Sequence, residues 1–285
     1  MKLYPKTSSL YRMLDSRQLA LKLVANVTYG YTGAGFSGRM PCSDLADSVV
    51  ALARFTLENT IAYVEQKKEW GAEVVYGDTD SLFVKVRGRS MESAFRIGAE
   101  IAKEITEKNP FPMELKFEKV YLPCLNLAKK RYCGMKFENL ADPGELESKG
   151  IETIRRDSVP AVTKILDKSL RVLFDTKDLS RVKEYLQRQW LKIVDGRVFP
   201  KDFMFAREVR LGTYANPPPA AMLALKAIEQ DPANIPRWRQ RVEYLLVSGV
   251  GGDQRKNVLK ELAVSPEEYI TNENYEINAQ YYIRS

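Results

Sequence analysis

Residues 73–86, EVVYGDTDSLFVKV, predict a β-hairpin. Two short runs rich in β-branched and aromatic residues flank the tight Gly77-Asp78 pair, which is typical of a two-residue turn. The tip of the hairpin therefore carries two carboxylates, those of Asp78 and Asp80. Like charges this close repel each other, yet turns favour aspartate for local reasons, and turn chemistry alone explains most isolated pairs of this kind. Other features of the chain are needed to judge whether these carboxylates bind a cation.

Long helical segments surround the hairpin. Segments 8–29 and 43–66 predict two helices joined by the glycine-rich turn GAGFSG, with Ser43 as the cap of the second helix. A third helix is expected over residues 90–108, and residues 113–137 predict further strands. This order predicts an α+β fold, in which helices cover one face of an antiparallel sheet.

The pattern changes near residue 157, where we expect a soft domain boundary. The elements expected beyond it are two amphipathic helices, a strand, a helix after the triple proline and a last strand, over residues 159–174, 179–194, 203–210, from 219, and 242–248. The final segment, 273–285, stops in mid-pattern, and we expect its apolar and aromatic residues to be unpaired. Both ends of the chain are therefore predicted to be cut.

Composition limits the chemistry that the chain can perform. The 285 residues include no histidine, which excludes Ser-His and Cys-His triads and the common histidine zinc sites. Any catalysis must use carboxylates, Lys, Tyr or a hard metal ion bound through oxygen. The three cysteines stand apart, and neither a membrane span nor a signal peptide is expected. The net charge of +7 favours a polyanionic partner, although a solvated surface explains it nearly as well.

The first predicted helix carries a polar stripe formed by four side chains: Gln18, Lys22, Asn26 and Tyr29. Helical geometry places them on one face, and their apolar neighbours are expected to face the core: Leu19, Leu21, Leu23, Val24 and Val27. A polar stripe is normally a solvated face. This one contains a single cation with no acid to pair with it, two amides and a phenol, which suits contact with a phosphate and an aromatic or sugar ring.

Four motifs in order resemble the signatures of the B-family DNA polymerases. RQLALKLVANVTYG (17–30) is similar to the fingers motif K-x-x-x-N-S-x-Y-G, and YGDTDS (76–81) is similar to a palm motif. AKKRYCG (128–134) and KGIETIRRD (149–157) supply two more matches. The resemblance extends along nearly the whole chain, and within the family NVTYGYTGAGFSGRMPCSDLADS and KFEKVYLPC resemble the zeta type more than the delta type.

The resemblance implies three domains and a two-metal reaction. The expected domains are the C-terminal fingers helix, an antiparallel RRM-like palm sheet backed by helices, and an incomplete mixed thumb, over residues 1–35, 36–156 and 157–285. In the complete enzyme Asp80 is the expected ligand of two Mg²⁺ ions and Asp78 has a supporting role. Glu118 is either a further acidic neighbour of the metals or a surface strand residue. Zinc or an iron–sulfur cluster is expected only in C-terminal modules that these residues do not include.

The same resemblance assigns the other site residues. Lys22 is expected to contact the incoming deoxynucleoside triphosphate and to protonate the pyrophosphate leaving group, while Asn26 and Tyr29 line the nascent base pair. Primer–template DNA is expected to contact Lys130, Arg131, Tyr132, Arg155 and Arg156, although the first three would also suit a basic strand edge that faces water. Accessory polymerase subunits, a nuclear location and no membrane association are also expected.

Two departures from the family pattern affect the expected function. Val27-Thr28 stands where the family has Ser after the fingers Asn, and we expect this change to tune tolerance of distorted primer ends. The family's first palm motif, D-x-x-S-L-Y-P-S, does not occur in the sequence, so we expect this chain alone to bind Mg²⁺ poorly and not to polymerise. The expected function is template-directed DNA synthesis, and translesion synthesis in a zeta-type catalytic subunit. The alternatives are a delta-type replicative polymerase and a non-catalytic DNA-binding remnant.

Overall fold

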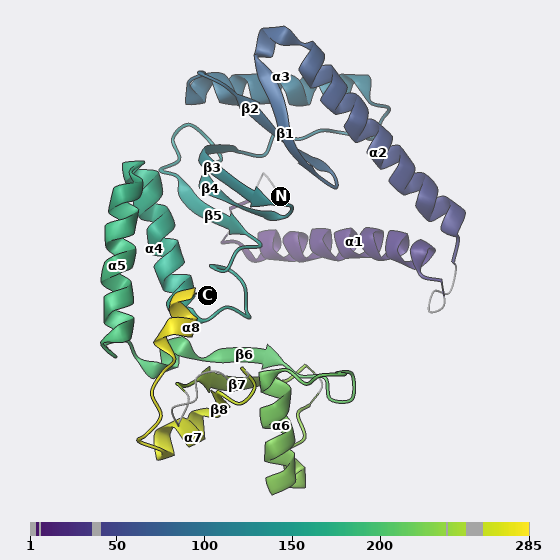
Figure 1. Ribbon diagram of the computed structural model, residues 1–285. Helices are drawn as coiled ribbons and strands as arrows, with labels where there is room; N and C mark the ends of the chain where they lie inside the picture. Colours follow the sequence, from purple (N-terminus) through teal and green to yellow (C-terminus); the bar gives the residue numbers. More distant parts are fainter. Residues whose placement is uncertain (1–3, 6, 36–40, 238, 249–258, 285) are drawn as a thin grey trace. The chain divides into compact units, whose positions relative to one another are not determined.

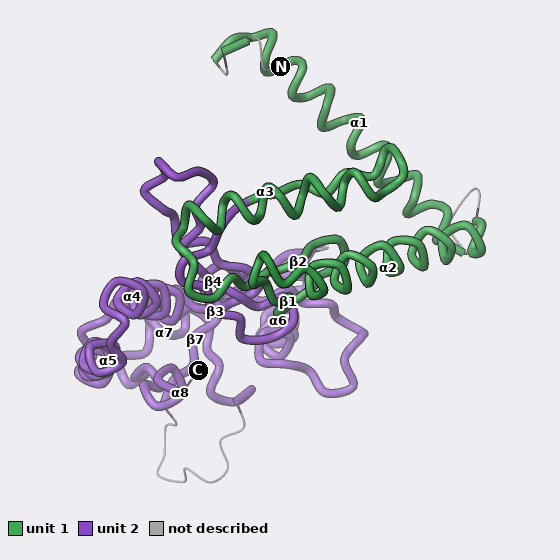
Figure 2. The backbone as a smooth tube through the Cα atoms, turned by 90° about the horizontal axis from the view of Figure 1, so that it is seen from above, with its two compact units in different colours: residues 1–118 green, residues 119–285 purple. Residues whose placement is uncertain are grey.

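The computed structural model describes residues 4–5, 7–35, 41–237, 239–248 and 259–284 (Figure 1). The chain forms two compact units, residues 1–118 and residues 119–285, which Figure 2 shows in different colours.

The first unit begins with two long helices, α1 (Ser9–Gly33) and α2 (Ser43–Gln66). The hydroxyl of Ser8 caps α1 by accepting a hydrogen bond from the Tyr11 N–H. The predicted Ser43 cap of α2 is wrong by one residue, because Cys42 occupies the cap position and makes no side-chain capping bond. Part of the predicted glycine-rich turn, residues 36–38, lies outside the described residues.

The apolar face of α1 is exposed, which contradicts the expectation that it packs into a core. None of the described residues of α1 is buried. The five apolar residues expected to face a core are between 50% and 72% exposed: Leu19, Leu21, Leu23, Val24 and Val27. Helical periodicity reveals that an apolar face exists but not what covers it, and no described part of the chain buries this one.

The core of the first unit lies between the helices and the hairpin. Strands β1 (Ala72–Asp78) and β2 (Ser81–Val86) pair antiparallel, and α3 (Met91–Lys108) follows, capped by the Ser90 hydroxyl (Figure 1). Five buried side chains form this core: Val64, Trp70, Ile97, Ile101 and Ile105. Three of them recur every four residues along α3, so the helix presents a single apolar stripe to the hairpin and α2. The predicted hairpin and third helix are confirmed.

Residues 113–119 differ from the prediction, because they are extended without forming a strand. Their backbone bonds go to a helix instead of a neighbouring strand: the Leu115 N–H donates to the Thr106 hydroxyl at 2.9 Å, and that hydroxyl donates to the Leu115 carbonyl at 3.2 Å. Phe117 packs so closely on α3 that a Cβ at Gly98 would lie 2.3 Å from its ring. The alternating burial of residues 113–119 therefore results from their packing on α3, and not from membership of a sheet.

The second unit starts with a three-stranded antiparallel sheet of order β3-β4-β5, formed by Val120–Ala128, Arg131–Phe137 and Glu145–Lys149. The sequence analysis did not predict β5. Helices α4 (Pro160–Thr176) and α5 (Leu179–Val194) follow as predicted, and the Asp178 carboxylate caps α5. Leu170 and Phe174 of α4 are buried with Cys133 of β4 and Ile151, so α4 packs against the sheet.

A second three-stranded sheet and three α-helices complete the described part of this unit. The sheet has the order β6-β7-β8, with strands Phe205–Glu208, Arg241–Leu246 and Ala263–Val264. The α-helices are α6 (Pro219–Gln230), α7 (Pro266–Thr271) and α8 (Ala279–Arg284). Short 3₁₀ helices occur at Lys68–Trp70 in the first unit, and at Pro200–Phe203 and Pro232–Asn234 in the second.

The expectation that the last aromatic residues are unpaired is wrong. Tyr282 is buried, its ring stacks on Phe205 with centroids 5.8 Å apart, and its hydroxyl donates to the Phe203 carbonyl at 2.8 Å. The same hydroxyl accepts from the Leu246 N–H at 3.0 Å. The C-terminal segment thus completes the core around β6 and β7, which a strand-by-strand reading of the sequence did not anticipate.

The α+β fold class is confirmed, with small antiparallel sheets in place of one continuous palm sheet. The expected domain boundaries at 35/36 and 156/157 stay predictions. Within the described ranges no helix has both the length and the apolar character needed to cross a membrane.

Candidate functional site

The two carboxylates of YGDTDS lie at the tip of the β1–β2 hairpin. Asp78 pairs with Ser81 as the last rung of the ladder, so the turn residues are Thr79 and Asp80 and not the predicted Gly77-Asp78 pair. Thr79 adopts a left-handed conformation with φ 57°, and the Asp80 N–H donates to the Asp78 carbonyl at 2.6 Å. Asp80 consequently stands exposed on the turn, whereas Asp78 is half-buried at the end of β1.

Local packing explains why the tip has this form. Gly77 lies against Leu82 and Leu57, and a Cβ at Gly77 would approach the Leu82 side chain to 3.3 Å. The rings of Tyr76 and Phe83 meet across the strands at a tilt of 50°, with centroids 5.5 Å apart. Below them the register shifts by one residue between Val74 and Tyr76, which indicates a β-bulge.

The polar stripe of α1 is exposed along its length. Lys22, Asn26 and Tyr29 follow one another on one face of the helix, and each is exposed. Lys22 takes part in no ion pair with a described residue, and neither a hydrogen bond nor an ion pair joins it to Asp80. The stripe is therefore available to an external ligand, and its predicted role opposite the hairpin stays a prediction.

Glu118 lies in the extended segment that precedes β3 and is exposed. It is therefore not a strand residue, as one reading of the sequence proposed. Among the described residues no three or more His, Cys, Asp or Glu side chains cluster tightly enough to hold a metal ion. The hairpin tip nevertheless offers two carboxylates two residues apart, one of them exposed, and carboxylate oxygen is the donor that hard divalent cations prefer.

The AKKRYCG motif forms the turn between β3 and β4. Ala128 pairs with Arg131, so Lys129 and Lys130 are the two turn residues, and Lys130 has a φ of 61°. Gly150 packs directly against this turn, because a Cβ there would lie 2.1 Å from the Lys130 carbonyl oxygen. Arg131 forms an ion pair with Glu152, so its guanidinium is already held by the protein.

A polar network that the sequence analysis missed lies next to Tyr132. The rings of Tyr121 and Tyr132 meet edge to face with centroids 6.2 Å apart. The Tyr121 hydroxyl and the Lys119 ammonium each donate to the same Glu147 oxygen at 2.7 Å. Burial and this bond raise the pKa of Tyr121 above its usual range, whereas the two donors outweigh burial and lower the pKa of Glu147.

The two arginines of KGIETIRRD have different surroundings. Arg155 is bound to Asp157 through two hydrogen bonds of 2.9 and 2.8 Å. Arg156 is exposed, and its side chain has no acidic partner among the residues that the structure describes. The bond from Arg155 and the nearby Arg207 hold the pKa of Asp157 well below its usual range. Sequence reasoning quoted Asp157 in the motif but gave it no role.

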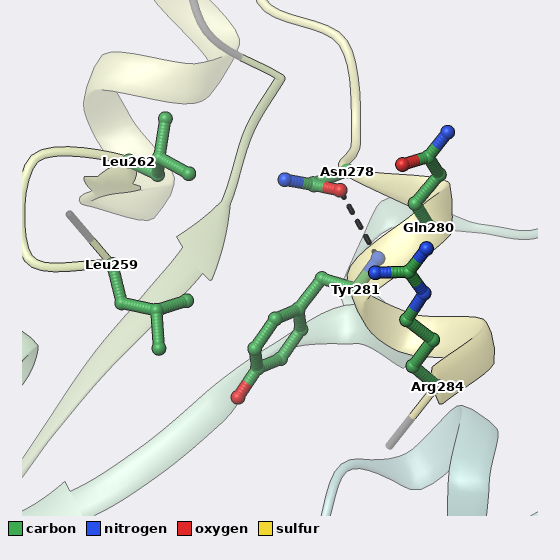
Figure 3. Close-up of a pocket in the computed structure, with 6 residues that line it drawn as sticks. All are labelled: Leu259, Leu262, Asn278, Gln280, Tyr281 and Arg284. Carbon is green, nitrogen blue, oxygen red and sulfur yellow. Dashed lines mark hydrogen bonds between the residues drawn. The ribbon is translucent and has the colours of Figure 1, made fainter. Parts of the chain in front are cut away.

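One surface hollow is remote in sequence from all of these residues. It has a volume of about 430 Å³ and lies beside α8, as Figure 3 shows. Its lining residues are Leu259, Leu262, Asn278, Gln280, Tyr281 and Arg284. One hydrogen bond, from the Tyr281 N–H to the Asn278 side-chain oxygen, spans part of it. None of the predicted site residues lines this hollow.

Comparison with known proteins decides the family. The sequence model of DNA polymerase family B matches residues 2–285. The chain belongs to DNA polymerase family B. Divalent-metal dependence and the use of DNA and nucleotides as substrates are general in this family, and the predicted resemblance is confirmed at this level.

The individual matches favour the zeta type. The chain is 49% identical over 280 residues to the DNA polymerase zeta catalytic subunit of Saccharomyces cerevisiae, which covers 97% of this chain and 18% of that protein. Identity to the DNA polymerase delta catalytic subunit of Schizosaccharomyces pombe is 32% over 281 residues, covering 96% of this chain and 25% of that protein. The chain thus spans less than a fifth of its zeta-type relative, and the predicted preference for zeta over delta is confirmed.

A solved structure also matches the whole fold. The family B DNA polymerase of Pyrobaculum calidifontis superposes with a TM-score of 0.64 at 27% sequence identity. The match covers 100% of this chain and 34% of that one. Both units of the present structure therefore correspond to parts of a polymerase.

Proposed function

We propose that this chain supplies part of the active centre for template-directed DNA synthesis in a zeta-type catalytic subunit, and that the complete enzyme performs translesion synthesis. The observation that carries the proposal is the family match along residues 2–285, in which the hairpin tip presents Asp80 to solvent. A delta-type enzyme is disfavoured by the lower identity, 32% against 49%.

Asp80 and Asp78 are the residues that would hold Mg²⁺, with Glu118 as a further acidic neighbour. When bound, a pair of such ions would offset the carboxylates and the triphosphate and stabilise the charge that develops on the transferred phosphorus. The chain's own contribution is to keep Asp80 on a turn fixed by the bonds around the Asp78 carbonyl, so that the carboxylate is presented without prior rearrangement.

Lys22 would contact the triphosphate and donate a proton to the pyrophosphate leaving group. An exposed ammonium with no acidic partner in the described chain is free to make this contact, and it does not have to break an ion pair first. Asn26 and Tyr29 follow it on the same face and would line the nascent base pair.

Primer–template DNA would lie along the β3–β4 turn and the segment after β5. Lys130, Arg131 and Tyr132 are the proposed contacts at the turn, and Arg155 and Arg156 are the proposed phosphate contacts beyond it. The structure supports Arg156 more strongly than Arg155, because Asp157 already binds the guanidinium of Arg155. Accessory polymerase subunits and a nuclear location complete the proposal.

A chimera tests the proposal. The chain replaces the matching segment of the Saccharomyces cerevisiae zeta catalytic subunit, and primer extension is measured with the parent chimera, with Asp80→Ala and with Lys22→Ala. We expect Asp80→Ala to lower the rate at least about 1,000-fold and Lys22→Ala about 100-fold, the sizes typical of lost charge stabilisation. Asp44→Ala, an exposed acid in the first turn of α2, is the control and should leave the rate unchanged.

Two outcomes would overturn the proposal. An inactive parent chimera that still binds primer–template DNA would favour the alternative, a non-catalytic DNA-binding remnant. Equal rates for the parent and Asp80→Ala would remove Asp80 from the active centre.

A further inference from the structure

The segment that carries KGIETIRRD is held at both ends by contacts within the second unit. At its start, Gly150 has a φ of 66° and touches the Lys130 carbonyl. Ile151 is buried with Leu170 and Phe174, and Glu152 binds Arg131. These contacts fix the start of the segment to the β3–β4 turn and to α4.

The end of the segment is fixed to the β6–β7 sheet by charged groups. One oxygen of Asp157 accepts from the Arg155 Nη2 at 2.8 Å and from the Arg207 Nη1 of β6 at 2.6 Å. From β7, the Arg241 Nη1 donates to the Arg156 carbonyl at 2.7 Å and to the Ala206 carbonyl at 3.0 Å. The carboxylate of Asp157 is half-buried, so these charge-assisted bonds are only partly screened by water.

Arg156 is the one member of Arg155-Arg156-Asp157 whose side chain takes part in none of these contacts, and it is exposed. Its neighbour on each side is bound, and its own carbonyl is held by Arg241. The backbone that carries the guanidinium therefore has little freedom, although the side chain itself faces solvent.

The geometry points to Asp157 as a positioning residue for DNA binding: by clamping Arg155 and Arg207 it fixes the backbone that presents Arg156 to a DNA phosphate. This inference rests on the proposed DNA-binding function and extends it to an acidic residue. It also explains why the Asp157 carboxylate lies among arginines on a surface that is proposed to bind DNA.

Electrostatics alone makes the opposite prediction for this residue. Removing a negative charge near a bound polyanion should strengthen binding, because one repulsive interaction is lost. A positioning role predicts weaker DNA binding by Asp157→Asn, because the backbone that carries Arg156 is no longer held in place. The sign of the change in affinity therefore separates the two.

The experiment measures binding of the 285-residue chain to a primer–template duplex by fluorescence anisotropy over a range of salt concentrations. We expect Asp157→Asn to weaken binding on the order of fivefold. Arg156→Ala should weaken binding and reduce the slope of log affinity against log salt by about 0.9. In the double variant, Asp157→Asn should add nothing to Arg156→Ala, because its effect acts through that side chain.

Asp202→Asn is the matched control. The side chains of Asp202 and Asp157 are both 27% exposed, and Asp202 likewise binds a basic partner, Lys164, in the same unit. It should not weaken DNA binding. Asp157→Glu, which keeps the charge, should recover part of the lost affinity.

Three other results would contradict the positioning role, the last of them together with the proposed DNA contacts. Unchanged or tighter binding by Asp157→Asn, beside a clear loss for Arg156→Ala, overturns the positioning role but leaves the proposed function intact. An equal loss from Asp157→Asn with and without Arg156 shows a general structural effect and also overturns it. Failure of the wild-type chain to bind the duplex contradicts the proposed DNA contacts and the inference together.

Discussion

Replacing Gly150 by alanine should destabilise the second unit far more than replacing Gly196, another glycine with a positive φ, by alanine. Gly150 has a φ of 66°, a backbone conformation that residues with a Cβ rarely adopt. Its added Cβ would lie 2.1 Å from the Lys130 carbonyl oxygen, and real Cβ atoms essentially never come within 3.0 Å of another heavy atom. The two backbones would have to separate by nearly 1 Å, the difference between these two distances.

The expected loss has two parts. The left-handed conformation costs an alanine about 1 kcal/mol. Separating the backbones disturbs the β3–β4 turn, the Arg131–Glu152 ion pair and the burial of Ile151, which together cost at least about 2 kcal/mol. The free energy of unfolding should therefore fall by about 3 kcal/mol or more.

Gly196 provides the control, because it has almost the same φ, 67°, but nothing lies within 4 Å of its added Cβ. Gly196→Ala should cost only the conformational part, about 1 kcal/mol. Urea unfolding followed by fluorescence gives both values, provided that the denaturant slope is the same in all proteins. Equal losses for Gly150→Ala and Gly196→Ala would refute the claim that the segment is packed on the turn.

Three further outcomes follow from the second unit. Tyr121→Phe should lower the free energy of unfolding by about 1–2 kcal/mol, because Glu147 loses a hydrogen bond, and an unchanged urea midpoint would contradict this. The pKa of Asp157 is lowered in the folded state, so its stabilisation is complete above the ordinary value of 3.8 and is lost as the pH falls through the folded value. Acid unfolding of Asp157→Asn should accordingly show a smaller loss of stability below about pH 4 than the wild type, and parallel curves would speak against the clamp. Tyr282→Phe should cost about 2 kcal/mol in thermal unfolding, because it leaves a buried carbonyl and a buried N–H without partners; a loss under about 0.5 kcal/mol would show that these groups find others.

Much of the fold follows from local sequence patterns. The helices of residues 43–66, 90–108 and 179–194 were predicted within two residues of their observed bounds, because each combines a regular apolar stripe with a clear start or stop signal. The hairpin was predicted by its β-branched runs. Its turn was placed two residues too early, because a threonine held at φ 57° by local hydrogen bonds carries no signal comparable to glycine.

The missed features depend on contacts between residues far apart in the chain. The short strand β5 exists because it pairs with β4, and the Tyr282 hydroxyl is satisfied by groups 36 and 79 residues away. In the candidate site two of the motifs fall on the β1–β2 hairpin and on the β3–β4 turn, and their predicted roles stay predictions. They could not show that Arg207 also binds Asp157, because that depends on how β6 and the segment before α4 meet.

The most direct test of the central claim asks whether the side chain at position 80 ligates the catalytic metal. In the chimera, Asp80→Cys replaces a hard oxygen ligand by a sulfur ligand, which Mn²⁺ tolerates better than Mg²⁺ does. Primer-extension rates are measured in each metal for the parent and the variant. We predict that the Mn²⁺-to-Mg²⁺ rate ratio rises at least about tenfold in Asp80→Cys. A ratio equal to that of the parent, with both rates reduced alike, would contradict direct metal binding by Asp80.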